Sequence, residues 1–152
     1  MRRSAPLVLL SAITPLVVAL AAVALAAPAT AAGRPLSTEL LGANEVGTAG
    51  DPDGSGTADV TVNPGTGQVC WEITVEGLDP VILGHIHRAP AGTNGGVVVD
   101  FMLTQADFVD GTASGCTTVD KALAKEILKD SDGFYVNVHT TTVPSGALRG
   151  QL

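Results

Sequence analysis

The sequence predicts an all-β protein, an antiparallel β-sandwich with one short helix near residues 118–129. Three observations support this fold class. Apolar and polar residues alternate over several short segments, which is typical of half-buried strands. Turns rich in Gly, Pro and Asn separate these segments at short intervals, as they do in sandwiches and barrels. A single segment has its apolar residues at helical spacing instead.

Seven segments are expected as strands: residues 36–46, 57–62, 68–77, 81–87, 97–102, 134–140 and 146–152. The sequence "NPGTG" at 63–67 is a strong turn signal, so the two strands on either side of it should form a hairpin. Within 68–77, Val69, Trp71 and Ile73 lie on one face of the strand, which places Trp71 in the expected core.

The expected helix comes from "TTVDKALAKEILKD" at 117–130. Its apolar residues recur at helical spacing and would pack on a sheet. Thr117 and Asp120 resemble a capping box at its start, Lys125 and Lys129 lie near its end, and Gly133 follows.

The first 32 residues are expected to be a secretory signal peptide, which leaves residues 33–152 as one domain. Two arginines precede an uncharged run over 7–27, and the A-x-A pattern at 29–31 suits signal peptidase. A retained membrane anchor is the alternative, because the uncharged run is long enough to span a bilayer. We expect a protein that is secreted or held in the cell envelope, with no membrane span in the mature chain.

The mature domain is expected to be acidic. The chain has 8 basic and 15 acidic residues, and loss of Arg2 and Arg3 leaves 6 basic residues and a net charge near −9. Such a surface excludes nucleic acid as an electrostatic partner. It is compatible with cation binding or with plain solubility.

Two cysteines, Cys70 and Cys116, favour one disulfide in an exported protein. The alternative is a pair of buried free thiols.

Several segments together resemble the CHRD domain, a family named after chordin. They are N-E-V at 44–46, H-x-H at 85–87, N-G-G-V-V-V at 94–99, Y-V-N-V-H-T at 135–140 and G-A-L-R-G-Q-L at 146–152. The resemblance covers residues 36–152. It implies an extracellular β-sandwich of the immunoglobulin-like or superoxide-dismutase-like kind, and a binding or structural role rather than an enzymatic one. In chordin such modules belong to a protein that binds growth factors. We do not expect that role to transfer to this short chain, and its extracellular partner is unknown.

All three histidines of the chain, His85, His87 and His139, fall in these motifs. His85 and His87 share one face of a strand, with Ile86 opposite. Three imidazoles suit copper or zinc, with water or a carboxylate completing the site. The alternative is a polar cluster that pins loops by hydrogen bonds.

The H-x-H pattern on a strand is also similar to copper–zinc superoxide dismutase. That enzyme needs about six histidines and an aspartate for its two-metal site, and this chain has three histidines. We therefore expect no enzyme and no catalytic residues, with a copper- or zinc-binding protein of dismutase-like chemistry as the alternative function.

The stretch "DPDGSGTADVTV" at 51–62 imitates the start of a calcium loop, with Asp51, Asp53 and Asp59 as candidate ligands. Val62 stands where a bidentate Glu is needed, and no helices flank the segment. An acidic hairpin loop is the expected outcome.

Overall fold

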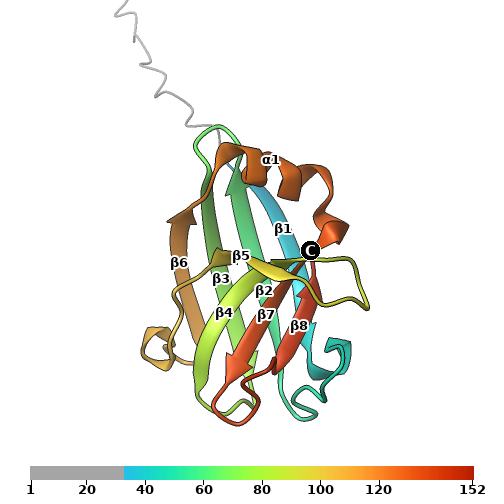
Figure 1. Cartoon of the computed structure of the whole chain (residues 1–152). Coiled ribbons are helices and arrows are strands. Elements are labelled where there is room, and N and C mark those ends of the chain that lie inside the picture. Colours follow the sequence, from blue (N-terminus) through green and yellow to red (C-terminus); the bar gives the residue numbers. More distant parts are fainter. Residues whose placement is uncertain (1–32) are drawn as a thin grey trace, which may run out of the picture.

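The computed structural model describes residues 33–152, which form eight strands and one α-helix (Figure 1). The strands are β1 (Arg34–Leu41), β2 (Ser55–Asn63), β3 (Gln68–Glu76), β4 (Val81–Arg88), β5 (Gly96–Asp100), β6 (Thr112–Thr118), β7 (Phe134–Thr140) and β8 (Leu148–Gln151). The helices are α1 (Lys121–Lys129) and three short 3₁₀ turns, η1 (Gly42–Asn44), η2 (Gln105–Asp107) and η3 (Ser131–Gly133). The expected signal peptide, residues 1–32, lies outside the described residues.

The strands form two layers that join along one edge. Their order in the sheet is β5-β4-β7-β8-β1-β2-β3-β6, and neighbours pair antiparallel. Figure 1 shows β1, β2, β3 and β6 in one layer, β4, β5, β7 and β8 in the other, and α1 across one end. The layers connect where Leu41 of β1 pairs with Arg149 of β8. The all-β prediction is confirmed, and the sandwich is one curled, nearly closed sheet.

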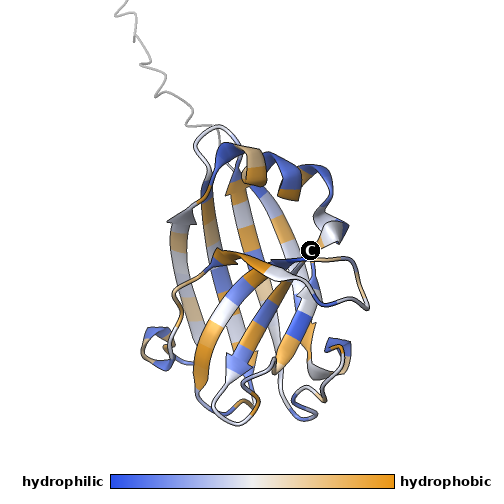
Figure 2. Ribbon diagram, viewed as in Figure 1, coloured by the Kyte–Doolittle hydropathy of each residue, from blue (hydrophilic) through white to orange (hydrophobic). Residues whose placement is uncertain are grey.

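The core lies between the two layers. The predicted face of β3 is buried, with Val69, Trp71 and Ile73 each at most 6% exposed. Figure 2 shows the corresponding alternation of apolar and polar residues along the strands. In the other layer, Ile86, Val136 and Leu148 are among the residues that face the core. Because every residue of β7 is buried, that layer is also covered on its outer face, by loops.

The sequence analysis missed β6. This strand pairs with β3 over its length, and its core-facing residues are small, Ala113 and Gly115. A Cβ on Gly115 would lie 2.7 Å from the Trp71 ring, so the indole fills the space that an apolar side chain of β6 would otherwise occupy. The predicted helix start at Thr117 was therefore wrong. Thr117 and Thr118 belong to β6, and α1 begins at Lys121 after Asp120, which makes no side-chain cap hydrogen bond.

The first strand also differs from its predicted range. It ends at Leu41 rather than at residue 46. The chain then turns at Gly42, where a Cβ would lie 1.8 Å from the Asp51 carbonyl oxygen. This close approach requires glycine. The N-E-V segment consequently forms part of a loop that folds over the outer face of the β4-β7-β8 layer.

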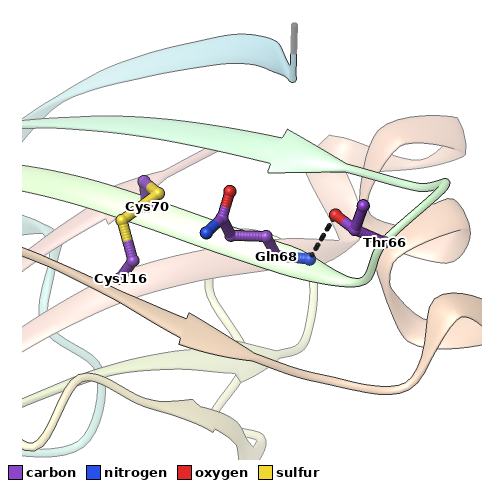
Figure 3. Close-up of a disulfide and its surroundings, with 4 residues drawn as sticks. All are labelled: Thr66, Gln68, Cys70 and Cys116. Carbon is purple, nitrogen blue, oxygen red and sulfur yellow. Dashed lines mark hydrogen bonds between the residues drawn. A yellow bond between two sulfur atoms is a disulfide. The ribbon is translucent and has the colours of Figure 1, made fainter. Parts of the chain in front are cut away.

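Cys70 and Cys116 form a disulfide between directly opposed residues of β3 and β6 (Figure 3). Their Sγ atoms are 2.11 Å apart. The bridge fastens β6, which is the last strand of the sheet, to its neighbour. Among residues 33–152, no helix is long and apolar enough to cross a membrane.

Candidate metal centre

The three histidines gather on the outer face of the layer formed by β4, β7 and β8. β4 supplies His85 and His87, and β7 supplies His139. The two strands pair antiparallel although 45 residues separate their ends at Arg88 and Phe134 along the chain, so the pairing places His139 opposite Leu83, next to His85. We refer to His85, His87 and His139 as the histidine trio. In the described part of the chain, it is the group of metal-type ligands that the fold brings together.

The ring nitrogens of the trio are close enough to share one ion. One ligand atom from each histidine lies within 4.8 Å of the other two. The His85 Nδ1 and His139 Nε2 atoms are 3.3 Å apart. Two nitrogens bound to one tetrahedral ion at 2.0–2.1 Å lie about 3.3 Å from each other. His85 and His139 therefore already have the spacing of two metal ligands. The ligand atom of His87 needs to move only slightly closer to them.

Backbone carbonyls determine which ring nitrogens of His87 and His139 carry the proton and which keep a lone pair. His87 Nδ1 lies 3.0 Å from the Gly95 carbonyl oxygen, and His139 Nδ1 lies 3.1 Å from that of Pro144. Because a carbonyl only accepts, both Nδ1 atoms carry the proton and both Nε2 atoms carry a lone pair. The Nε2 atom of His87 is buried and has no hydrogen-bond partner. A buried polar atom in this state is costly unless a ligand satisfies it.

His85 has the opposite orientation. Its Nδ1 faces His139, and its Nε2 lies 3.9 Å from Asp100 Oδ1 on β5. Without an ion, His85 must protonate Nδ1 to donate to His139, which leaves a lone pair facing the Asp100 carboxylate. If His85 held an ion through Nδ1, its proton would be on Nε2 and would face that carboxylate instead. Carboxylates commonly orient metal-binding histidines in this way.

Burial keeps the trio in the neutral form that binds metals. His85 and His139 are each 8% exposed, and His87 is partly buried. Desolvation lowers the pKa of all three imidazoles below their ordinary value. His139 further lowers the pKa of His85, and the Arg149 cation lowers that of His87. Asp100 acts in the opposite direction on His85.

Tyr135 and Arg149 support the trio from the side of β8. The His87 ring stacks on Tyr135 with centroids 4.8 Å apart and planes 7° apart. The Arg149 guanidinium lies 3.4 Å from the centroid of the same Tyr135 ring. Because β7 lies between β4 and β8, Tyr135 stands between His87 and Arg149. This stack fixes the plane of one candidate ligand.

The loops that cover the outer face are tied down by Arg149. This residue is 2% exposed, and it donates to Asn94 Oδ1 and to the carbonyls of Pro90 and Thr93. Asn94 in turn donates to the Val46 carbonyl in the neighbouring loop. These contacts close the loop over 89–95 on the face that holds the trio.

Glu45 lies beside this network. Its carboxylate accepts a hydrogen bond from Asn137, the residue opposite both His85 and Arg149 in the sheet. Burial raises the pKa of Glu45, while Asn137 and Arg149 act to lower it.

The candidate calcium ligands are not brought together. The Asp51 carboxylate accepts from the amides of Asp53 and Gly54 and so closes its own turn. Asp59 lies within β2 and accepts from the Ser37 hydroxyl of β1. Asp51 and Asp53 thus lie in the loop before β2, and Asp59 lies within that strand.

Sequence reasoning missed the supporting roles of Asp100, Tyr135, Glu45 and Arg149. The available signal was the alternation along "FYVNVHT", which puts Tyr135, Asn137 and His139 on one face of a strand. What the sequence lacked was the pairing of β4 with β7 and the path of the covering loops.

Comparison with known families gives the class of the protein. The CHRD domain model matches residues 36–152, and the chain belongs to this family. No curated protein and no solved structure matches it.

Proposed function

We propose that this CHRD protein is an exported, non-enzymatic binding module that holds one transition-metal ion, copper or zinc, on its histidine trio. The ligand atoms are His85 Nδ1, His87 Nε2 and His139 Nε2. The observation that carries the proposal is the buried, partnerless Nε2 of His87, which lies beside two further ring nitrogens in a ligand-like arrangement.

The donor set argues for the kind of metal. Calcium and magnesium prefer oxygen ligands, whereas neutral imidazoles suit copper and zinc. Affinity for a nitrogen site rises toward copper along the divalent series and falls again at zinc, so copper should outcompete zinc. Asp100 supports the same assignment, because its carboxylate favours the His85 tautomer that binds through Nδ1.

A binding role fits the site better than dismutase chemistry. Three histidines and no further grouped ligands in residues 33–152 provide for one ion, and the two-metal arrangement of the dismutase needs about twice as many. The ligands are also mostly covered, whereas a catalytic metal keeps a position open to its substrate.

Export is supported by the N-terminal sequence pattern and by the disulfide, which is typical of oxidising compartments. N-terminal sequencing of protein recovered outside the cell should begin at Ala32 or Gly33. Recovery of the intact chain in the membrane fraction contradicts this part of the proposal.

The metal site is tested on protein purified without an affinity tag. Elemental analysis should find close to one copper or zinc per chain, or the metal-free protein should take up one equivalent in calorimetric titration. Titration with calcium is the matched control, because surface carboxylates would bind it whereas the trio would not. Absence of any uptake of copper and zinc refutes the proposal.

A further inference from the structure

Met102 lies close to the metal centre. It is 77% exposed, and the remaining methionine of the chain is Met1. Its backbone has φ 55°, a left-handed conformation that non-glycine residues seldom adopt. The Met102 amide donates to Asp100 Oδ1 at 2.8 Å, and this is the carboxylate that faces His85. One acidic side chain thus contacts both the methionine turn and a candidate ligand. Residues in such conformations are concentrated at ligand sites.

The side chain of Met102 belongs to the face that carries the trio. Phe101 and Leu103, its neighbours in sequence, are buried in the core. A Cβ added to Gly84 of β4 would lie 2.9 Å from Leu103 and 3.2 Å from Phe101, so both residues pack under Gly84 on the inner side. Met102 lies between these two buried residues and is itself 77% exposed, so its side chain projects away from the core, to the outer side. His85 and Leu83 of β4 lie on that side.

The sheet register puts Met102 within reach of His85. Asp100 is directly opposite His85, and the antiparallel pairing continues through the hydrogen bond from the Phe101 amide to the Gly84 carbonyl. β5 ends at Asp100, and the Met102 amide nitrogen and His85 Nε2 lie 2.8 and 3.9 Å from the same Asp100 Oδ1 atom, so Met102 is a close neighbour of His85. Methionine has three rotatable bonds and a polarisable sulfur, so it can swing from solvent onto an ion held by the trio.

We propose that Met102 is a further, thioether ligand of the metal centre and that it gives the site selectivity for Cu(I). The inference rests on the proposed function, because Met102 alone cannot hold an ion. Soft thioethers select Cu(I), whereas three imidazoles alone do not distinguish it strongly from Zn(II). An exposed methionine beside a covered trio takes up the ion from solvent and passes it to the nitrogens.

The test compares Cu(I) and Zn(II) binding by the untagged full chain and by the Met102→Leu variant. Cu(I) is added under argon as its acetonitrile complex, with bicinchoninate as the competing chelator, so that no thiol reductant attacks the disulfide. Leucine keeps the size of the side chain and removes the sulfur. Met102→Leu should weaken Cu(I) binding by about tenfold or more and leave Zn(II) binding unchanged, a change of the size that support groups of metal sites produce.

A second variant moves the thioether rather than deleting it. Val109 is 71% exposed and lies in the turn before β6, so Met102→Leu combined with Val109→Met keeps the sulfur content constant. This double variant should remain as weak for Cu(I) as Met102→Leu. X-ray absorption should show a copper–sulfur contact in the wild type and lose it in Met102→Leu, with Met1 common to all three proteins.

Three results overturn the inference: equal Cu(I) affinity in wild type and Met102→Leu, restored affinity in the double variant, or no sulfur around copper in the wild type. If any of these occurs while the wild type still binds Zn(II) or Cu(II), the histidine site stands and the role of Met102 alone is wrong. If the wild type binds none of the three ions, the proposed function fails with it.

Discussion

Substitution of His87 by alanine tests the metal centre most directly. The change removes the ligand atom that is buried without a partner and leaves His85 and His139 facing each other. It also removes the hydrogen bond to the Gly95 carbonyl and the stacking on Tyr135. These two contacts contribute about 1 kcal/mol each, so the metal-free variant should be less stable by up to about 2 kcal/mol.

The effect of the metal itself can be estimated from the size of the domain. An ion present at about 100 times its Kd adds about 2.7 kcal/mol to the free energy of unfolding. The described domain spans residues 33–152, and at about 2.1 cal/mol/K per residue its unfolding entropy is about 0.25 kcal/mol/K. The wild type should therefore gain about 11 °C in Tm. If the variant binds about 100-fold more weakly, the same metal concentration adds about 0.4 kcal/mol, or less than about 2 °C.

The assay is thermal unfolding with and without copper or zinc, each protein compared with its own metal-free form. His87→Phe is a useful second variant, because it keeps a ring on Tyr135 and removes the ligand. A double substitution of Asp51 and Asp53 by asparagine controls for ions bound to surface carboxylates, and it should keep the full shift. A metal-induced shift in His87→Ala as large as that of the wild type would refute the reasoning.

Three further predictions follow from the same structure. The pKa of each member of the histidine trio is lower in the folded protein than its ordinary value of 6.5, so the unfolded chain takes up protons first. The metal-free protein should therefore lose stability as the pH falls below about 6.5. Metal affinity should fall over the same pH range, because protonated imidazole cannot bind a metal. Urea midpoints measure the stability and metal titrations measure the affinity, each from about pH 8 to about pH 5, and flat profiles argue against neutral ligands. Replacement of both Cys70 and Cys116 by serine removes a bridge between residues with a sequence separation of 46, and it should lower the free energy of unfolding by about 4 kcal/mol. Urea unfolding measures this loss, and a loss below about 1 kcal/mol would show that the bridge adds little. Asp100→Asn should reduce metal affinity by about tenfold or more with little change in metal-free stability, and unchanged affinity would show that Asp100 does not orient His85.

The strands that sequence analysis found are those with large apolar residues on one face. In β3, Val69, Trp71 and Ile73 signal their buried side by size alone. β6 gave no such signal, because its inward positions are Ala113 and Gly115 and the volume that they leave is filled by Trp71 of the neighbouring strand. The alternation of apolar residues in one segment indicates only the side chains that this strand itself places in the core. It does not indicate a side chain of a neighbouring strand that fills the same space.

The candidate site was predictable in its ligands and not in its surroundings. The spacing of His85 and His87 on one strand fixes their common face locally. His139 joins them only because β4 pairs with β7, a contact that spans β5, β6 and α1 in the chain. The covering loops depend on contacts of still longer range, such as the hydrogen bond from Arg149 to the Thr93 carbonyl. None of these contacts leaves a periodic pattern in the sequence.

Loop pinning and metal binding, the two interpretations that the sequence left open for the histidines, use different atoms of the same rings. The Nδ1 atoms of His87 and His139 hold the loops at Gly95 and Pro144, and their Nε2 atoms keep the lone pairs that an ion needs, that of His139 facing His85 Nδ1. Each loop contact fixes the tautomer and rotation of its ring, so it prepares the opposite nitrogen for binding. A purely structural cluster would have no need to leave the Nε2 of His87 buried without a partner. The loop contacts therefore count in favour of a metal site rather than against it.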